Sequence, residues 1–283
     1  MFSPIIREFR KRIKTVTYQF RKGSLVAGAA CFVSCCVLSM AQKGYIKNID
    51  ALFTFALCYI LTDHYLDDNN ISKDQKKETV KQLNKFINDP SPRQTSNENE
   101  IVQAVGSRYT DMINKIPSCS EHLKIIYNYE LESTALQYKN NLNRQEYLTI
   151  AEKKGGLTFL AIQSLLEMEI TNEEYKVGAC IQLVDDLLDI NEDIRDGINT
   201  IATHDLITNN NLDKLLIYTV KSICELNRVY NVFKVLLLPL LMFAVHTNKK
   251  MYSCEIIQIL LPFIHFDESF NKRYLVDRIN SFL

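Results

Sequence analysis

The sequence predicts an all-α protein. The chain has 283 residues, 47% of them hydrophobic, with only 8 glycines and 6 prolines. Alternating β-branched runs bounded by turn residues are scarce, whereas apolar residues recur at the spacing of helix faces. A chain of this length can bury a large core as one unit. We therefore expect a single-domain helical bundle.

The N-terminus is basic and is followed by an apolar run from Leu25 to Ala41. Only Glu8 is acidic in the first 23 residues, which contain Arg7, Arg10, Lys11, Arg12, Lys14, Arg21 and Lys22. Three interpretations stay open: a targeting peptide or signal anchor, a basic amphipathic helix on a membrane surface, or the first helix of the domain. The apolar run is short for a membrane span, which favours a buried first helix. We divide the chain into a basic segment, 1–23, and an all-α domain, 24–283.

Charge and cysteine usage narrow the class of protein. The formal net charge is zero, which argues against an overall electrostatic attraction to nucleic acid. The eight cysteines lie mostly inside apolar helical patterns, and none has the spacing of a zinc site. They predict buried, reduced thiols and a cytoplasmic location, with membrane association through the basic N-terminus left open.

A buried helix that ends in acids is predicted first. Residues 51–61 are apolar nearly all round, which is typical of a helix buried on every side. Asp63 and Asp67 follow at helical spacing, at the helix end where the dipole disfavours acids. Asp68 precedes Asn69 and Asn70, and an exit turn explains it as well as a functional role does.

The middle of the chain predicts further helices over 72–88, 100–115, 119–140 and 144–170, with a loop between the first two. Within the last of these, Lys153 and Lys154 precede Gly155 and Gly156. Two glycines cost about 1 kcal/mol each in a helix, so we expect a bend, or a ligand or backbone that approaches closely. Exposed lysines beside a packing kink, or an anion contact at a cavity wall, both fit.

An acidic helix follows, and we expect it to run to about residue 197. Its acids fall within a sector about 120° wide, and no lysine occurs between Lys176 and Lys214. We expect Arg195 to point away from these acids. A solvated face remains an alternative, but carboxylates stacked this way are stabilised by a divalent cation that prefers oxygen ligands. The acids are Asp185, Asp186, Asp189, Glu192, Asp193 and Asp196.

Farther on, residues 232–246 with Lys234 and Pro239 predict a kinked core helix rather than a span.

Over residues 45–205 these stretches resemble the class I isoprenoid synthase superfamily, which includes polyprenyl diphosphate synthases, squalene and phytoene synthases and terpene cyclases. The resemblance lies in Asp63-x-x-x-Asp67-Asp68, in Lys-Lys-Gly-Gly at 153–156 and, most specifically, in the QxxDDxxD-like segment 182–189. It implies an all-α bundle around a deep apolar cavity, the isoprenoid synthase fold, with two acidic clusters facing each other at the mouth.

The resemblance also implies chemistry. Asp63, Asp67, Asp185, Asp186 and Asp189 would be catalytic and would ligate Mg²⁺. Lys153, Lys154 and Gln182 would bind a prenyl diphosphate substrate. The cations separate substrate phosphates from carboxylates, and ionisation leaves an allylic carbocation that needs an apolar pocket.

The sequence departs from the chain-elongating members. His64 stands where a second acid is common, and Lys76-Lys77 is a poor substitute for their arginine pair. These departures favour coupling or cyclisation. The alternative is a catalytically silent helical subunit that regulates or scaffolds an active prenyl synthase, so a homodimer and a heterodimer are both compatible. A di-iron site using His64 and His122 lacks the usual Glu-x-x-His pairs.

Overall fold

Every regular element that the structure describes is helical. The computed structural model describes residues 32, 36, 39, 44–68, 70–89, 100–137 and 142–260, of which four (67, 100, 137 and 260) are described by backbone alone. These residues form eleven α-helices and three short 3₁₀-helices, with no strand among them. The all-α prediction is confirmed. The basic segment 1–23, most of the apolar run 25–41 and most of the predicted loop lie outside the described residues.

The described chain divides into two compact units. One contains the described residues up to 131 together with 161–169, and the other contains residues 132–160 and 170–260. The chain passes between the units within two of its helices, α6 and α7, which comprise Ser120–Gln137 and Arg144–Leu165. The single-domain organisation and its boundary at residue 24 stay predictions.

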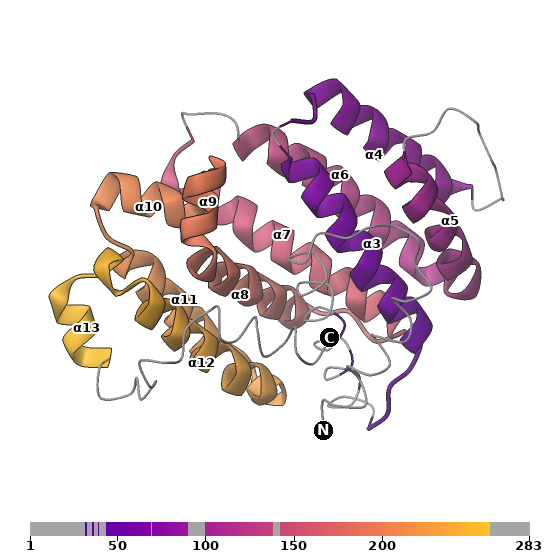
Figure 1. Ribbon diagram of the computed structural model, residues 1–283. Coiled ribbons are helices and arrows are strands. Elements are labelled where there is room, and N and C mark those ends of the chain that lie inside the picture. The colour runs from indigo at the N-terminus through magenta and orange to yellow at the C-terminus, as the bar shows by residue number, and fades with distance from the viewer. Residues whose placement is uncertain are drawn as a thin grey trace, which may run out of the picture. The chain divides into compact units, whose positions relative to one another are not determined.

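The first unit is built on three helices, in which α5 packs against α3 and α4 (Figure 1). They are α3 (Ile49–Asp67), α4 (Lys73–Asn88) and α5 (Glu100–Lys115), followed by the 3₁₀-helix η1 (Pro117–Cys119) and the start of α6. The expected burial of α3 is confirmed, since most residues between Ala51 and Leu61 are buried. Inside this unit, the hydroxyl of Tyr59 donates to the buried carboxylate of Glu130 at 2.7 Å.

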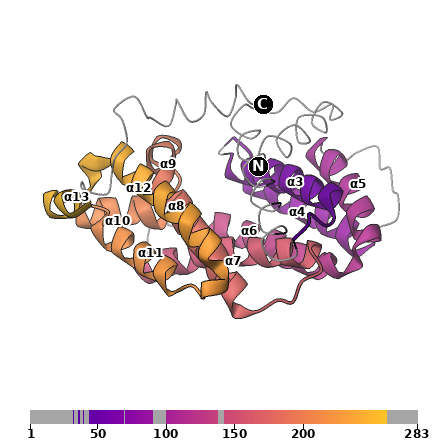
Figure 2. The same ribbon diagram turned by 90° about the horizontal axis from the view of Figure 1, so that it is seen from below.

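The second unit surrounds α8, which packs against α10, α11 and α12. Figures 1 and 2 show α12 alongside α8. After α7 the order is α8 (Asn172–Leu188), α9 (Ile190–Asp196), α10 (Ile201–Asn209), α11 (Asp213–Glu225), η2 (Arg228–Tyr230), α12 (Asn231–Thr247), η3 (Lys249–Met251) and α13 (Cys254–Leu260).

Capping hydrogen bonds determine where α4 begins and where α7 ends. Ser72 caps α4 in a capping box with Gln75, which agrees with the predicted start at residue 72. The prediction for α7 was too long, because this helix ends at Leu165 rather than at residue 170. Glu167 then adopts a left-handed conformation with φ of 51°, and the amide of Met168 donates to the carbonyl of Gln163, which closes the helix.

Two predictions about the core need correction. Cys36, Cys58, Cys119 and Cys180 are buried as expected, but Cys224 and Cys254 are exposed. Helix α12 runs through Pro239 and belongs to the core on one side only, because 39% of the 18-residue apolar window within Arg228–Thr247 is buried. That window and Ile49–Leu66, which is 61% buried, are the two segments among the described helices that are long and apolar enough to cross a membrane. This criterion is weak, since a core helix such as α3 also meets it.

Candidate functional site

The acidic segment forms two helices, not the single helix that we predicted. A capping box between Thr171 and Glu174 starts α8, and the chain bends at Asp189, which is both the last cap of α8 and the first cap of α9. The amide of Asp189 donates to the carbonyl of Asp185 at 2.9 Å. The carbonyl of Asp189 accepts from the amides of Glu192 and Asp193. The acids therefore do not share one straight helix face.

Asp186 is the buried member of the acidic segment, with 6% of its surface exposed. The side-chain amide of Gln182 donates to Oδ1 of Asp186 at 2.9 Å, and a longer contact of 3.5 Å joins it to Asp185. Asp185 is exposed and Asp189 is half-buried. Three of the predicted site residues thus lie close together: Gln182, Asp185 and Asp186.

The charge on Asp186 is incompletely compensated. Burial raises the pKa of Asp186 to about 6, and the negative charge of Asp189 adds to this rise. The hydrogen bond from Gln182 and the positive charge of Lys154 oppose it. At neutral pH the carboxylate is ionised in a poorly solvated position, which a cation bound to it would stabilise.

Glycines bring Lys154 and this carboxylate together, because α7 and α8 cross where Gly155 meets Gly178. A Cβ on Gly155 would overlap the carbonyl oxygen of Gly178 and lie 2.7 Å from Cβ of Gln182. A Cβ on Gly156 would overlap the ring of Tyr175. The close approach expected at the glycine pair is that of a neighbouring backbone, and helix α7 continues through it. Lys154 is half-buried beside this crossing, whereas Lys153 is exposed.

The remaining acids of the segment have local partners. Thr200, which caps α10, donates from its hydroxyl to Asp193 at 3.2 Å. Arg195 pairs with Asp196 at 2.8 Å, so the prediction that Arg195 points away from the acids is wrong. This pair lowers the pKa of Asp196. Glu192 and Asp196 are both exposed, as in the solvated alternative.

The first acidic cluster lies in the other unit. Asp63 is half-buried on α3, and Asp67 is the last residue of that helix, with a side chain outside the described set. Asp68 forms the predicted exit turn, since its Oδ1 accepts from the amide of Asn70 at 2.8 Å. The convergence of Asp63 and Asp67 with the α8 acids stays a prediction.

The donor chemistry of α8 fits a hard cation, although the described side chains contain no preformed metal cluster. Among the described side chains, no group of three or more His, Cys, Asp and Glu residues is arranged to hold a metal ion. Asp185, Asp186 and Asp189 offer carboxylate oxygens, which Mg²⁺ prefers. The buried carboxylate with its raised pKa is the observation that favours a cation at this position.

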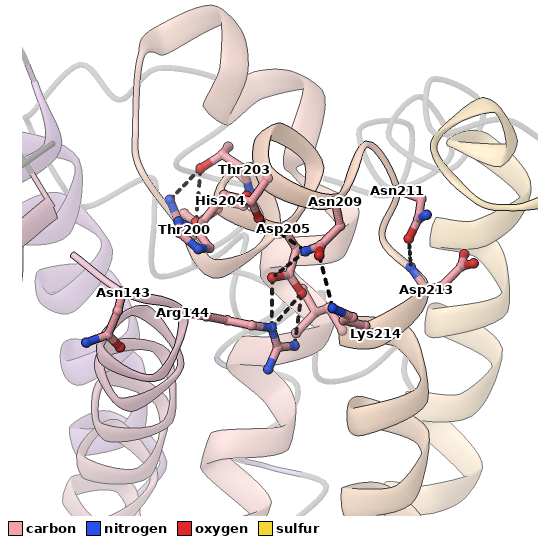
Figure 3. A network of polar contacts seen from close by, with 12 residues as sticks. Asn143, Arg144, Thr200, Thr203, His204, Asp205, Asn209, Asn211, Asp213 and Lys214 are labelled. Carbon is pink, nitrogen blue, oxygen red and sulfur yellow. Dashed lines mark hydrogen bonds and ion pairs between the residues drawn. The ribbon is translucent and has the colours of Figure 1, made fainter. Parts of the chain in front are cut away.

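The sequence did not reveal the polar network that joins α10 to the start of α7 (Figure 3). The guanidinium of Arg144, at the start of α7, makes three hydrogen bonds to Asp205, of 2.8 Å to Oδ1 and of 2.9 and 3.1 Å to Oδ2. Asp205 is fully buried on α10, and Asn209 donates to the same carboxylate. Bidentate pairs of this kind fix orientation as well as distance. The two partners are 61 positions apart, so no local spacing could have identified them.

Comparison with known proteins identified no related protein. No protein-family model, no curated protein and no solved structure matches the chain. The resemblance to isoprenoid synthases therefore rests on the motif residues themselves.

Proposed function

We propose that the chain is a Mg²⁺-dependent, class I isoprenoid synthase-like enzyme that ionises a prenyl diphosphate for coupling or cyclisation. The observation that carries the proposal is the buried Asp186 carboxylate on α8. It is held by Gln182, has Lys154 near it across a glycine crossing, and has a pKa raised by burial. A solvated acidic face would not bury this carboxylate against a helix that carries a lysine.

Each residue has a distinct role in the proposed site. Asp185 and Asp189 would hold Mg²⁺ together with Asp186, and Asp63 and Asp67 would hold it from α3. Bound Mg²⁺ neutralises a diphosphate leaving group and stabilises it as the bond to carbon breaks. Gln182 orients the Asp186 carboxylate through the 2.9 Å hydrogen bond. Lys154, and Lys153 from the exposed side of α7, would contact the diphosphate oxygens.

The proposal is tested by following pyrophosphate release from geranyl, farnesyl and geranylgeranyl diphosphate with Mg²⁺. We expect turnover of at least one substrate and a loss of about 100-fold or more in Asp185→Ala, the size seen when one electrostatic stabiliser of a transition state is removed. Asp196→Asn is the matched control, because it removes an exposed acid that is paired with Arg195 in the same segment. Circular dichroism verifies that both variants fold.

The competing function is a silent subunit that regulates or scaffolds an active synthase. No turnover of any of the three substrates, alone or with isopentenyl diphosphate, would favour that function. Equal rates for wild type and Asp185→Ala would refute the assigned site even if turnover were found.

A further inference from the structure

Helix α12 presents an apolar surface that no described part of the chain covers. Val235 is 71% exposed, Leu236 and Leu240 are each 38% exposed, and Pro239 is exposed between them. These four positions are one turn apart in pairs and so lie on one side of the helix. Val229, just before α12, is 73% exposed. Isolated exposed apolar residues are common, but a contiguous stripe of this kind marks an interaction surface.

The opposite side of α12 is packed within the second unit. Phe233, Leu237 and Leu241 are buried, and α12 contacts α8 and α11. In Figure 2, α12 lies in the foreground of this unit, with no other described helix drawn in front of it. A helix with one side fixed to its own domain cannot cross a bilayer alone. It can lie in the interface with its free apolar side against the acyl chains.

The charged residues of the chain segment that carries the stripe are all basic, although two carboxylates from elsewhere in the unit contact this segment: Glu173 accepts from the amide of Asn227, and Asp213 accepts from the amide of Ser253. No acidic residue occurs between Glu225 and Glu255, whereas that interval contains Arg228, Lys234, Lys249 and Lys250. Arg228 is exposed before the helix, and Lys249 and Lys250 are exposed immediately after it. Lys234 is half-buried, and its ammonium donates to the carbonyl of Cys224 at 2.9 Å. An apolar stripe with exposed cations at both ends matches an anionic lipid surface.

A pocket lies at the end of the helix where the two lysines are found. It measures about 460 Å³ and is lined by Lys249, Lys250, Tyr252, Cys254, Ile257 and Gln258. Its lining combines two cations with an apolar side chain from α13. A lipid phosphate needs such cations, and the first carbons of a lipid need such an apolar wall.

We propose that the second unit docks on an anionic membrane through the α12 stripe, Val235, Leu236, Pro239 and Leu240, with Lys249 and Lys250 binding lipid phosphate. This contact is distinct from any contact of the basic N-terminus, and it does not depend on the proposed enzymatic function. The occupant is a lipid surface rather than a second copy of the chain, because the cations at the two ends of the stripe would repel their own copies across a two-fold interface.

Flotation of the full chain with vesicles tests the proposal. We expect binding to vesicles of phosphatidylcholine and phosphatidylserine in equal parts, and little binding to phosphatidylcholine alone. The double variant Val235→Ser/Leu240→Ser should bind about tenfold or more weakly, through lost apolar burial. Lys249→Ala/Lys250→Ala should lose about fivefold per lysine.

The matched control is Ile207→Ser/Ile217→Ser, which removes two apolar side chains that are 78% and 56% exposed elsewhere in the same unit. This control should bind like wild type. Unchanged binding in the α12 variant, whether through the N-terminus or otherwise, would overturn the proposal. So would light scattering that shows a wild-type dimer and a monomeric Val235→Ser/Leu240→Ser variant, because the stripe would then join two copies.

Discussion

Asp186 is the residue on which the proposed chemistry depends, and its burial makes it measurable without a substrate. The carboxylate has a pKa of about 6, raised from an ordinary value of 3.8. Between these two pH values the folded protein binds more protons than the unfolded chain. Stability therefore falls as the pH rises through this window, and the deficit is complete above it.

We predict that Asp186→Asn, which keeps an oxygen to accept from Gln182, stabilises the metal-free protein at pH 7 by roughly 2 to 3 kcal/mol. The stability difference should shrink towards pH 4, where the wild-type carboxyl is protonated. Urea unfolding of the wild type and the variant at several pH values measures the stabilisation at pH 7 and its decrease towards pH 4. Glu192→Gln is the control, since it removes an exposed acid from the same segment and should keep the wild-type pH profile. An Asp186→Asn variant that is less stable than wild type at pH 7 would show that the carboxylate is better compensated than we infer.

Some residues of the candidate site could be predicted from the sequence, and others could not. Helical spacing singled out Asp63, Asp185 and Asp186 as candidates, because periodicity determines which neighbours share a face, whereas Gln182 came only from the resemblance to the QxxDDxxD segment. Spacing could not identify Asp186 as the buried acid. Its burial depends on how closely α7 approaches α8, and that approach depends on Gly178. The Arg144 and Asp205 pair was equally hidden, since its partners meet only in the folded unit.

At the scale of helices, the crossing of α7 and α8 fixes the surroundings of the acidic segment. Gly155 and Gly178 are both buried, and each lacks room for a Cβ because of the other's carbonyl oxygen. The sequence indicated one half of this contact through the Gly155-Gly156 pair. The other half, a single glycine inside a helical pattern, carries no signal of its partner.

We predict that Gly178→Ala destabilises the protein by about 3 kcal/mol or more, because the two backbones must separate. The sign is diagnostic, since the same change in an unconstrained helix interior stabilises by about 1 kcal/mol. Lys176→Ala, at an exposed position of the same helix, should change the free energy of unfolding little. A neutral or stabilising Gly178→Ala would contradict the close crossing.

Helix α12 shows where composition misleads. Its apolar residues and Pro239 predicted a core helix, and periodicity could not correct this, because a helix that is apolar all round has no polar side to indicate solvent. The apolar α3 was predicted as a core helix in the same way and is one. The exposure of Val235, Leu236, Pro239 and Leu240 on α12 distinguishes the two helices.

Across the whole molecule, composition and periodicity predicted the all-α class and most helix ranges. The break at Asp189 was missed because no glycine or proline marks it, and backbone hydrogen bonds of Glu192 and Asp193 to Asp189 restart the helix there. The proposed function needs residues of both units, since Asp63 belongs to one unit and Asp185 to the other. Cooperation between these two acids is therefore the central claim.

Calorimetric titration of a non-hydrolysable prenyl diphosphate analogue into the full chain tests this claim most directly. We predict binding that requires Mg²⁺, that is lost in Asp63→Ala and in Asp185→Ala alike, and that persists in Asp196→Asn. Binding that is unchanged when Mg²⁺ is omitted, or that survives in both alanine variants, would contradict the claim that acids from the two units hold the diphosphate through a shared cation.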